Sequence, residues 1–322
     1  MAGLGRGLEL GRRVAGHCRS ALALATLSLG GALGGVVGGV LSGVLVGILG
    51  GASPAEAGCG PTVAQACAVS QGSYHIALPG PEHRTPIAAG QSAAMPAVVF
   101  LHGYGGSGRA ALNQRAMVQG LKARGYAVIA PDALSQDGGP RSWNFLPGWQ
   151  GRDEVEFLQE VAADAAARFD LDRQTMILAG FSAGGFMVNY LACSAPGAFA
   201  GYAPIAGGFW RPQPAACAGE IRLFHSHGWN DGVVPLEGRF LGGGRFQQGD
   251  IFAGLELWRA TNHCAEEAPD RRWQEGEILR RRWDCGPGAD IEFLLFPQGH
   301  QVPDWWSGAV LDWFETPQQE AG

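Results

Sequence analysis

Ser182 stands at the centre of a Gly-x-Ser-x-Gly pattern, the spacing that can place a nucleophilic serine on a sharp turn. An apolar, strand-like run at 176–179 enters the pattern, and an apolar, helix-compatible segment leaves it. Gly180 and Gly184 suit such a turn, because side chains there would collide with the crossing strand and helix. A Gly-rich chain produces the pattern by chance, so the strand-turn-helix context is what favours a nucleophile over an ordinary turn.

A serine hydroxyl is a poor nucleophile at its free pKa, so Ser182 needs a histidine base and a carboxylate that fixes the tautomer of that base. Asp231 follows a strand-like segment at 221–224, and His300 follows another at 291–296. With a Gly-x-Ser-x-Gly nucleophile, the chain order of the three groups is Ser, acid, His. The sequence therefore predicts a triad of Ser182, Asp231 and His300.

Other candidates exist for the acid and the base. Asp250 and Asp304 are alternative acids, and a turn-forming role is the alternative for Asp231, which precedes a glycine. His225 and His227 precede the acid in the chain, so we expect them to shape its loop.

A Gly-rich turn follows the apolar strand expected at 96–101. It lacks the residues of a phosphate-binding loop, and we expect it to supply an oxyanion-hole amide from Tyr104, with His102 supporting the turn. The second amide would be that of Ala183, at the start of the helix.

Strand-like and helix-like segments alternate along the chain. Apolar residues alternate with others at 73–78, which predicts a half-buried edge strand. Apolar strands are expected at 96–101, 126–130, 176–179, 203–206, 221–224 and 291–296, and helices at 110–122, 152–169 and 305–314. Continuously apolar strands that alternate with helices predict an α/β fold with a mostly parallel sheet and helices on both faces. Residues 237–248, with three consecutive glycines, are expected to form a mobile insert over the site.

The first 57 residues have the composition of an export segment. Arginines end at Arg19, an uncharged stretch covers 21–50, and Ala55 to Ala57 offers a small-x-small cleavage site. Arg12 and Arg13 suggest a twin-arginine signal, and the general secretory route stays open. A retained membrane helix is the alternative, because thirty uncharged residues could span a bilayer. We therefore expect an export segment at 1–57, a single catalytic domain at 58–322, and a secreted or periplasmic protein without stable membrane association unless that segment is retained.

Charge and cysteine content restrict the function further. Formal net charge is −6, and the first 57 residues contribute four arginines against two glutamates, so the remainder carries −8. An acidic body of this kind argues against a nucleic-acid partner. Six cysteines remain after the export segment, and proximity in sequence suggests the disulfides Cys59 with Cys67, Cys193 with Cys217, and Cys264 with Cys285. Their spacing does not favour a metal site.

Several motifs together resemble the esterases grouped with polyhydroxybutyrate depolymerases, which are α/β-hydrolases related to feruloyl and acetylxylan esterases. The motifs are Leu101–Ser107 (LHGYGGS), the helix from Asp153 to Phe169, Gly180–Gly184, Ala203–Gly207 (APIAG), His227–Pro235 (HGWNDGVVP) and Gly299 with His300. The resemblance runs from about residue 97 to 315 and gives Ser182, Asp231 and His300 the triad roles. It implies hydrolysis of a small or oligomeric ester without a metal or organic cofactor.

The sequence departs from this family at the rim of the site. Trp229 and Asn230 replace the usual Thr-x before the acid, and Trp305 lies further from His300 than the family's tryptophan does. These departures concern the substrate, so feruloyl or acetylxylan esters are an alternative to hydroxyalkanoate oligomers. We find no separate polymer-binding domain, which favours soluble oligomers or small esters over crystalline polyester. A serine peptidase, or a catalytically silent binding protein on the same scaffold, is the alternative from another class.

Aromatic residues are candidates to line the acyl or alcohol pocket, although each such residue is more often core packing than a ligand contact. The candidate substrate contacts are His102, Trp143, Trp229 and Trp305, with Phe145, Trp149 and Trp210 as further aromatic candidates.

Overall fold

The computed structural model describes residues 59–60, 65–83, 94–135, 138–146 and 148–316. The expected export segment at 1–57 lies outside these residues. Within the described part of the chain, no helix combines the length and the apolar character that crossing a bilayer requires.

Ten strands form one sheet, in the order β1-β2-β4-β3-β7-β8-β9-β14-β13-β12. The six strands from β4 to β14 pair in parallel, and the strands at both edges pair antiparallel. The strands of this sheet are β1 (Cys67–Val69), β2 (Gly72–Ala77), β3 (Ala97–Leu101), β4 (Ala127–Pro131), β7 (Ile177–Phe181), β8 (Gly201–Ile205), β9 (Arg222–Gly228), β12 (Arg271–Glu275), β13 (Ile278–Gly286) and β14 (Ala289–Phe296). The mostly parallel sheet expected from the sequence is confirmed.

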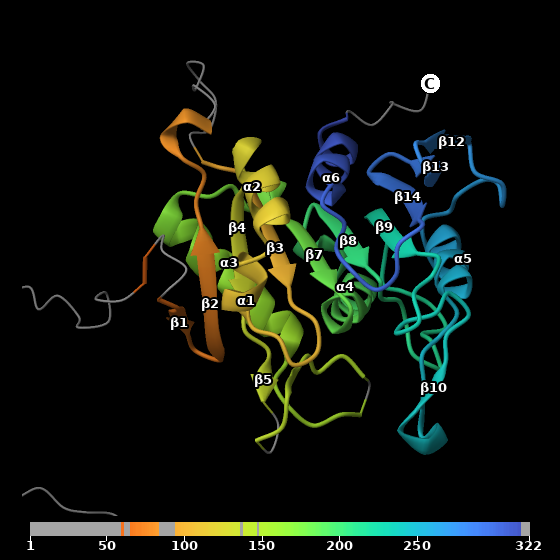
Figure 1. The fold of residues 1–322 in the computed structure, drawn as a ribbon, viewed down its shortest axis with the longest axis horizontal. Coiled ribbons are helices and arrows are strands. Elements are labelled where there is room, and N and C mark those ends of the chain that lie inside the picture. The colour runs from red at the N-terminus through yellow and green to blue at the C-terminus, as the bar shows by residue number, and fades with distance from the viewer. Residues whose placement is uncertain (1–58, 61–64, 84–93, 136–137, 147, 317–322) are drawn as a thin grey trace, which may run out of the picture. The chain divides into compact units, whose positions relative to one another are not determined.

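Helices cover both faces of the sheet, as Figure 1 shows. They are α1 (Gly108–Leu112), α2 (Arg115–Ala123), α3 (Glu154–Phe169), α4 (Ala183–Ser194), α5 (Ile251–Thr261) and α6 (Trp306–Glu315). On β3, Val98 and Phe100 pack with α1, α2 and α6, whereas Val99 and Leu101 pack with α3, α4 and α5. This alternation is the period-two pattern of a strand, and its burial on both faces explains why the sequence of β3 is apolar throughout.

Three parts of the fold differ from the sequence expectation. The helix expected at 110–122 is two helices, α1 and α2. Helix α5 and the charged strands β12 and β13 were not predicted, because β13 contains three consecutive arginines and lacks an apolar alternation. The strand expected at 221–224 extends to Gly228, through buried polar residues that the search for apolar runs missed.

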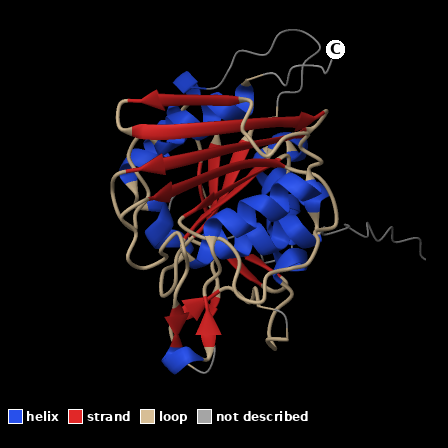
Figure 2. Ribbon diagram, turned by 90° about the vertical axis from the view of Figure 1, so that its right-hand side faces the viewer, coloured by secondary structure: helices blue, strands red, loops and turns tan. Residues whose placement is uncertain are grey.

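Residues 237–248 form a small hairpin. It contains β10 (Phe240–Leu241), the short 3-10 helix η4 (Gly242–Gly244) and β11 (Phe246–Gln247). Figure 2 shows this hairpin projecting beyond the main sheet, at the bottom of the view. A second small hairpin pairs β5 (Leu134–Ser135) with β6 (Arg141–Ser142).

Three disulfides join the cysteines that are neighbours in sequence. The structure pairs Cys59 with Cys67, Cys193 with Cys217, and Cys264 with Cys285. The last of these ties the loop after α5 to β13, on the antiparallel side of the sheet.

Candidate active site

Ser182 lies at the turn between β7 and α4, with φ 57° and ψ −117°. A positive φ is uncommon for a residue other than glycine and costs of the order of 1–3 kcal/mol, so the surrounding structure must hold it in place. The backbone N–H of Ser182 donates to the Ile205 carbonyl at 2.9 Å. Its side chain makes no capping hydrogen bond to α4, which leaves the hydroxyl available for chemistry.

The two glycines of the pattern allow this turn. A Cβ atom on Gly180 would lie 2.5 Å from the Gly184 carbonyl oxygen, and one on Gly184 would lie 2.2 Å from the Leu101 oxygen. Both distances are shorter than a non-bonded contact permits, so the close crossing of β7, α4 and β3 requires glycine at both positions. The collision expected from the sequence for side chains at Gly180 and Gly184 is therefore found in the structure.

Asp231 and His300 lie on the loops that follow β9 and β14, two adjacent parallel strands. His300 Nδ1 is 2.7 Å from Asp231 Oδ2. Asp231 Oδ1 accepts hydrogen bonds of 2.8 Å from the backbone N–H groups of Val233 and Val234. Because an ionised carboxylate only accepts, the proton of the neutral imidazole is on Nδ1, and Nε2 is free to act as a base.

The pKa of Asp231 is lowered from its ordinary value. Burial on its own would raise this pKa, but the hydrogen bonds from His300 and from the Val234 and Val233 amides outweigh burial. The carboxylate therefore stays ionised at neutral pH.

Contacts between the two loops hold Asp231 close to His300. Asn230 donates from its side-chain amide to the Pro297 carbonyl at 2.7 Å, and the Trp229 N–H donates to the Phe296 carbonyl at 2.9 Å. A Cβ atom on Gly228 would lie 2.2 Å from the Gln298 oxygen, so this glycine lets the loops approach closely.

Ser182 and His300 are placed at the same edge of the sheet, but within the described residues no hydrogen bond joins them. The imidazole of His300 lies 4.6 Å, between ring centroids, from Phe181, the residue before the serine. In structures without substrate, such catalytic hydrogen bonds are often long and tighten only in the complex. The structure thus joins Asp231 to His300, and sets the imidazole beside the turn that carries Ser182.

The turn after β3 lies against the nucleophile turn. A Cβ atom on Gly103 would be 3.3 Å from the Cβ atom of Ser182. The backbone N–H groups of Tyr104 and Ala183 have no acceptor among the described residues, whereas the neighbouring Gly105 N–H donates to the Arg141 carbonyl at 2.8 Å. Two unused amides beside the serine suit an oxyanion hole.

His102 holds this turn from inside the protein. Its Nδ1 lies 2.7 Å from the Gly103 carbonyl and its Nε2 accepts from the Ala133 N–H at 3.1 Å, so the ring is a neutral Nδ1–H tautomer. The indole of Trp143 donates to the His102 carbonyl at 2.8 Å. Both side chains are buried. The sequence made His102 and Trp143 candidates for substrate contact. Because both are buried, a role in supporting the turn is favoured instead.

His225 and His227 support the loop of Asp231. His227 Nε2 donates to the Val234 carbonyl at 2.8 Å and lies 3.6 Å from Asp231 Oδ2. Its Nδ1 therefore accepts from His225 Nε2, at 3.3 Å. Burial lowers the pKa of both imidazoles, so both stay neutral.

These buried neutral histidines predict a pH-dependent stability. Burial also lowers the pKa of His102. Below the unfolded-state pKa of about 6.5, the unfolded chain binds protons that the folded chain does not, so stability falls as the pH drops. We expect a lower Tm at about pH 5 than at about pH 7.5 by calorimetry, and a smaller difference in the His225→Gln variant. An equal or higher Tm at the lower pH would contradict this. The lowered pKa of Asp231 also stabilises the folded protein, and this contribution is lost only at more acidic pH, as the pH falls below the ordinary pKa of 3.8.

An aromatic cluster lies along the first turns of α4. Phe145 packs on Phe186 at 5.7 Å and on Tyr190 at 5.6 Å, and Trp210 packs on Phe186 at 5.7 Å. Phe246, from the 237–248 hairpin, contacts Trp210 at 6.0 Å. Phe186, Tyr190 and Phe246 were not predicted as site residues. The helical spacing of Phe186 and Tyr190, four and eight residues after Ser182, is the signal that would have placed them on the face next to the turn.

The remaining predicted aromatic contacts differ in exposure. Trp229 is 40% exposed, in the loop that leads to Asp231. Trp305 is only partly buried, and packs edge-on against Phe296 at 5.6 Å. Trp229 therefore remains the candidate with the more accessible surface. Asp250 caps α5 through the Ala253 N–H, and neither Asp250 nor Asp304 pairs with a histidine in the described part of the chain. No group of three or more acids, histidines or cysteines in that part could hold a metal ion.

Comparison with known proteins shows which family and which fold this chain resembles. A model of the "Alpha/beta hydrolase family" matches residues 98–319. The poly(3-hydroxyalkanoate) depolymerase C of Paucimonas lemoignei is 31% identical over 142 residues, which covers 41% of this chain and 31% of that protein. The match therefore spans about a third of the relative's length. The acetyl xylan esterase from Aspergillus awamori has a similar fold, with a TM-score of 0.54 and 14% identity over 75% of this chain and 93% of that one.

Proposed function

The chain belongs to the alpha/beta hydrolase family, and from that premise we propose that it is a serine ester hydrolase with Ser182, His300 and Asp231 as its triad. The observation that carries the proposal is the 2.7 Å hydrogen bond between His300 and Asp231, on adjacent strand ends beside the strained turn of Ser182. A histidine oriented by a buried carboxylate next to an uncapped serine is the arrangement that activates a hydroxyl.

The proposed reaction proceeds through an acyl-enzyme. The Ser182 oxygen attacks the ester carbonyl while His300 Nε2 takes the hydroxyl proton. Asp231 stabilises the imidazolium that forms, and the amides of Tyr104 and Ala183 donate to the oxyanion. The imidazolium then gives its proton to the leaving alcohol, and a water molecule activated in the same way releases the acid.

The proposed substrates are hydroxyalkanoate oligomers and similar small esters. The name of the Paucimonas relative supports this class. Tyr190 and Trp210, the partly exposed members of the aromatic cluster, support it too, because their rings offer apolar surface beside α4. We expect the purified protein to cleave hydroxybutyrate oligomers and short-chain p-nitrophenyl esters faster than feruloyl esters or acetylated xylan. If it cleaves none of the four faster than its Ser182→Ala variant does, the proposal fails.

The division into an export segment at 1–57 and a catalytic domain at 58–322 belongs to the same proposal. Three disulfides suit an oxidising compartment such as the periplasm or the exterior of the cell. N-terminal sequencing of protein from the culture medium or periplasm would locate the cleavage site.

Two substitutions of Tyr104 test the oxyanion hole, because one removes the backbone N–H and the other changes only the side chain. Tyr104→Pro removes the amide donor, and the loss of one such donor lowers kcat by about 10²- to 10³-fold. The matched variant Tyr104→Phe keeps the amide and the ring, and should turn over p-nitrophenyl butyrate at close to the unmodified rate. If the proline variant has near-normal kcat, Tyr104 is not the donor.

A further inference from the structure

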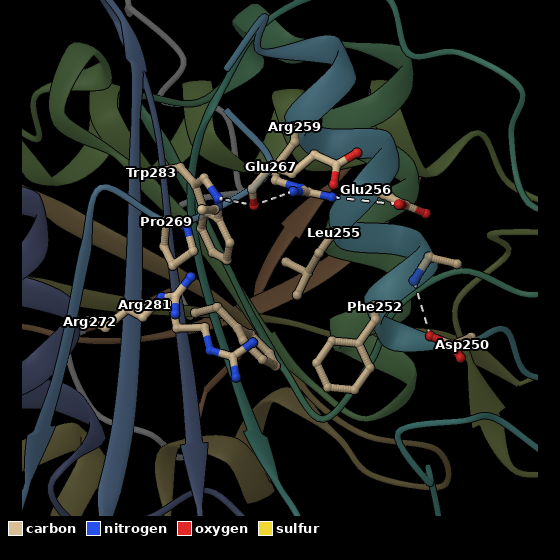
Figure 3. Close-up of a pocket in the computed structure, with 13 residues that line it drawn as sticks. Asp250, Phe252, Leu255, Glu256, Arg259, Glu267, Pro269, Arg272, Arg281 and Trp283 are labelled. Carbon is tan, nitrogen blue, oxygen red and sulfur yellow. Dashed lines mark hydrogen bonds and ion pairs between the residues drawn. The ribbon is translucent and has the colours of Figure 1, made fainter. Parts of the chain in front are cut away.

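A cavity of about 560 Å³ lies between helix α5 and the antiparallel strands β12, β13 and β14. Figure 3 shows its walls, with Leu255 and Phe252 projecting from the helix and two arginines, Arg272 and Arg281, on the strand side. None of the residues in the proposed ester-hydrolysis mechanism lines this cavity.

The strand wall is a row of directly opposed residues. Arg272 of β12 pairs in register with Arg281 of β13, and Arg281 pairs with Phe293 of β14. Because directly opposed side chains on adjacent strands stand on the same face, the two guanidinium groups lie side by side next to an aromatic ring.

The two arginines differ from their neighbours on β13. Arg280 pairs with Glu275 and Glu292, and Arg282 pairs with Asp284, Asp290 and Glu292. These acids neutralise Arg280 and Arg282, whose side chains lie on the opposite face of β13 from Arg281. Arg272 and Arg281 are exposed, and no ion pair or hydrogen bond joins their guanidinium groups to another described residue. Like charges directly opposite each other on a sheet are destabilising, so an anion bound between these two would remove a repulsion.

Three acids line the cavity, Asp250, Glu256 and Glu267, and none of them pairs with Arg272 or Arg281 among the described residues. The backbone carbonyl of Glu267 accepts hydrogen bonds from Arg259 and Trp283. Asp250 accepts the Ala253 N–H as the cap of α5, and Glu256 lies 3.6 Å from Arg259. Figure 3 shows both carboxylates on the helix side of the cavity, away from Arg272 and Arg281.

The rest of the wall is apolar. Phe252 is 42% exposed and packs edge-on against Phe293 at 5.8 Å. The indole N–H of Trp283 donates to the Glu267 carbonyl at 3.1 Å, so this ring has no free donor to offer. The cavity therefore combines a cationic end with an aromatic end.

The disulfide between Cys264 and Cys285 holds two walls of the cavity at a fixed distance. Cys264 follows α5 and Cys285 lies in β13, so the bond fixes the helix wall to the strand wall. A fixed separation lowers the ordering cost of binding.

We propose that this cavity binds a small organic anion, with a carboxylate between Arg272 and Arg281 and a flat aromatic body against Phe252 and Phe293. Guanidinium groups match the planar carboxylate with paired N–H donors. The volume is within the range of about 300–1,000 Å³ that is usual for small-molecule sites. Benzoate cannot fill such a space, so a two-ring aryl carboxylate is the appropriate probe.

The experiment is isothermal titration of the full chain with 2-naphthoate, and with 2-naphthamide as the neutral analogue of equal shape. We expect saturable binding of the carboxylate and binding of the amide at least about tenfold weaker, since the amide lacks the charge. Arg272→Gln and Arg281→Gln should each weaken 2-naphthoate binding by about tenfold or more. Arg271→Gln is the matched control, because Arg271 is as exposed as Arg272 and Arg281 but does not line the cavity. The control removes the same charge from the adjacent position of the same strand.

Three results would overturn the site. They are no saturable binding of 2-naphthoate, equal binding of the amide, and a loss in Arg271→Gln as large as in the two cavity variants. Comparison of Tm values shows whether each variant is folded. If a glutamine variant does not fold, the double variant Arg272→Lys with Arg281→Lys replaces it, because lysine keeps both positive charges. In that double variant, binding should persist with reduced affinity, because the ammonium groups lack the planar fork. The measurement needs no ester turnover, so its failure leaves the proposed hydrolase activity untouched.

Discussion

Replacing Ser182 with alanine is expected to lower kcat for p-nitrophenyl butyrate by something on the order of 10⁶. The physical reason is that the hydroxyl is the atom that forms the acyl-enzyme, and no neighbouring group on the turn can replace it. Alanine keeps the small volume at the crossing of β7 and α4, although its positive φ remains strained. The purified variant should therefore fold, with a circular dichroism spectrum like that of the unmodified protein.

Ser194→Ala is the matched control. Ser194 is the last residue of α4, and its hydroxyl bonds to the Tyr190 and Leu191 carbonyls of its own helix. Ser194 lies twelve positions after Ser182, which is a helical rise of about 18 Å. This variant should retain kcat. Activity retained by Ser182→Ala would show that ester cleavage occurs by another route.

Asp231→Asn should lower kcat by about 10⁴. The asparagine oxygen can still accept the Val233 and Val234 amides, so the loop should keep its shape. Its NH₂ group would then face His300 Nδ1, and two donors cannot pair there. The imidazole would adopt the other tautomer, with its proton on Nε2, where it can no longer accept the proton of Ser182.

The two carboxylates that the sequence leaves as alternatives provide the controls. Asp250→Asn keeps the helix cap, since asparagine caps as well as aspartate, and Asp304 is exposed on the loop before α6. Neither variant should change kcat by more than about threefold, the scale of effects away from the reacting groups. If Asp304→Asn loses kcat by about 10⁴-fold while Asp231→Asn keeps normal kcat, the acid of the triad is Asp304 and not Asp231.

The sequence was most informative where backbone geometry restricts residue type. Gly180 and Gly184 are required by contacts of 2.5 and 2.2 Å that a Cβ atom would make. The same restriction made the turn at Ser182 recognisable. Strands β3 and β4 were predictable for a related reason, since strands covered on both faces must be apolar throughout.

The antiparallel edge of the sheet was not predictable from apolar periodicity. Arg280 and Arg282 occupy β13 because acids on β14 and on neighbouring positions neutralise them. Such cross-strand pairs depend on register, which the sequence of one strand does not reveal. The extension of β9 through His225 and His227 was missed because these two side chains are buried and polar. They bond to each other, and His227 bonds to the Val234 carbonyl, which apolar periodicity does not reveal.

Within the site, the sequence singled out Asp231 and His300 and expected His102, His225 and His227 to support their surroundings. It did not indicate the contacts that Trp229 and Asn230 make between the two loops. The bond between His300 and Asp231 joins residues 69 positions apart, and the order of motifs was sufficient to select them. The contact of Phe246 with Trp210 could not be predicted, because it joins the 237–248 hairpin to a residue 36 positions earlier in the chain. Mobility of that hairpin stays a prediction.

The account rests on Ser182 as an activated nucleophile, and a fluorophosphonate probe tests this directly. Such a probe phosphonylates a serine only when a neighbouring base activates its hydroxyl. The measurement is intact mass followed by peptide mapping after reaction of the purified full chain. We predict one adduct, on Ser182, that forms much more slowly in Asp231→Asn. An adduct on another residue, or none in a preparation that hydrolyses esters, would contradict the account.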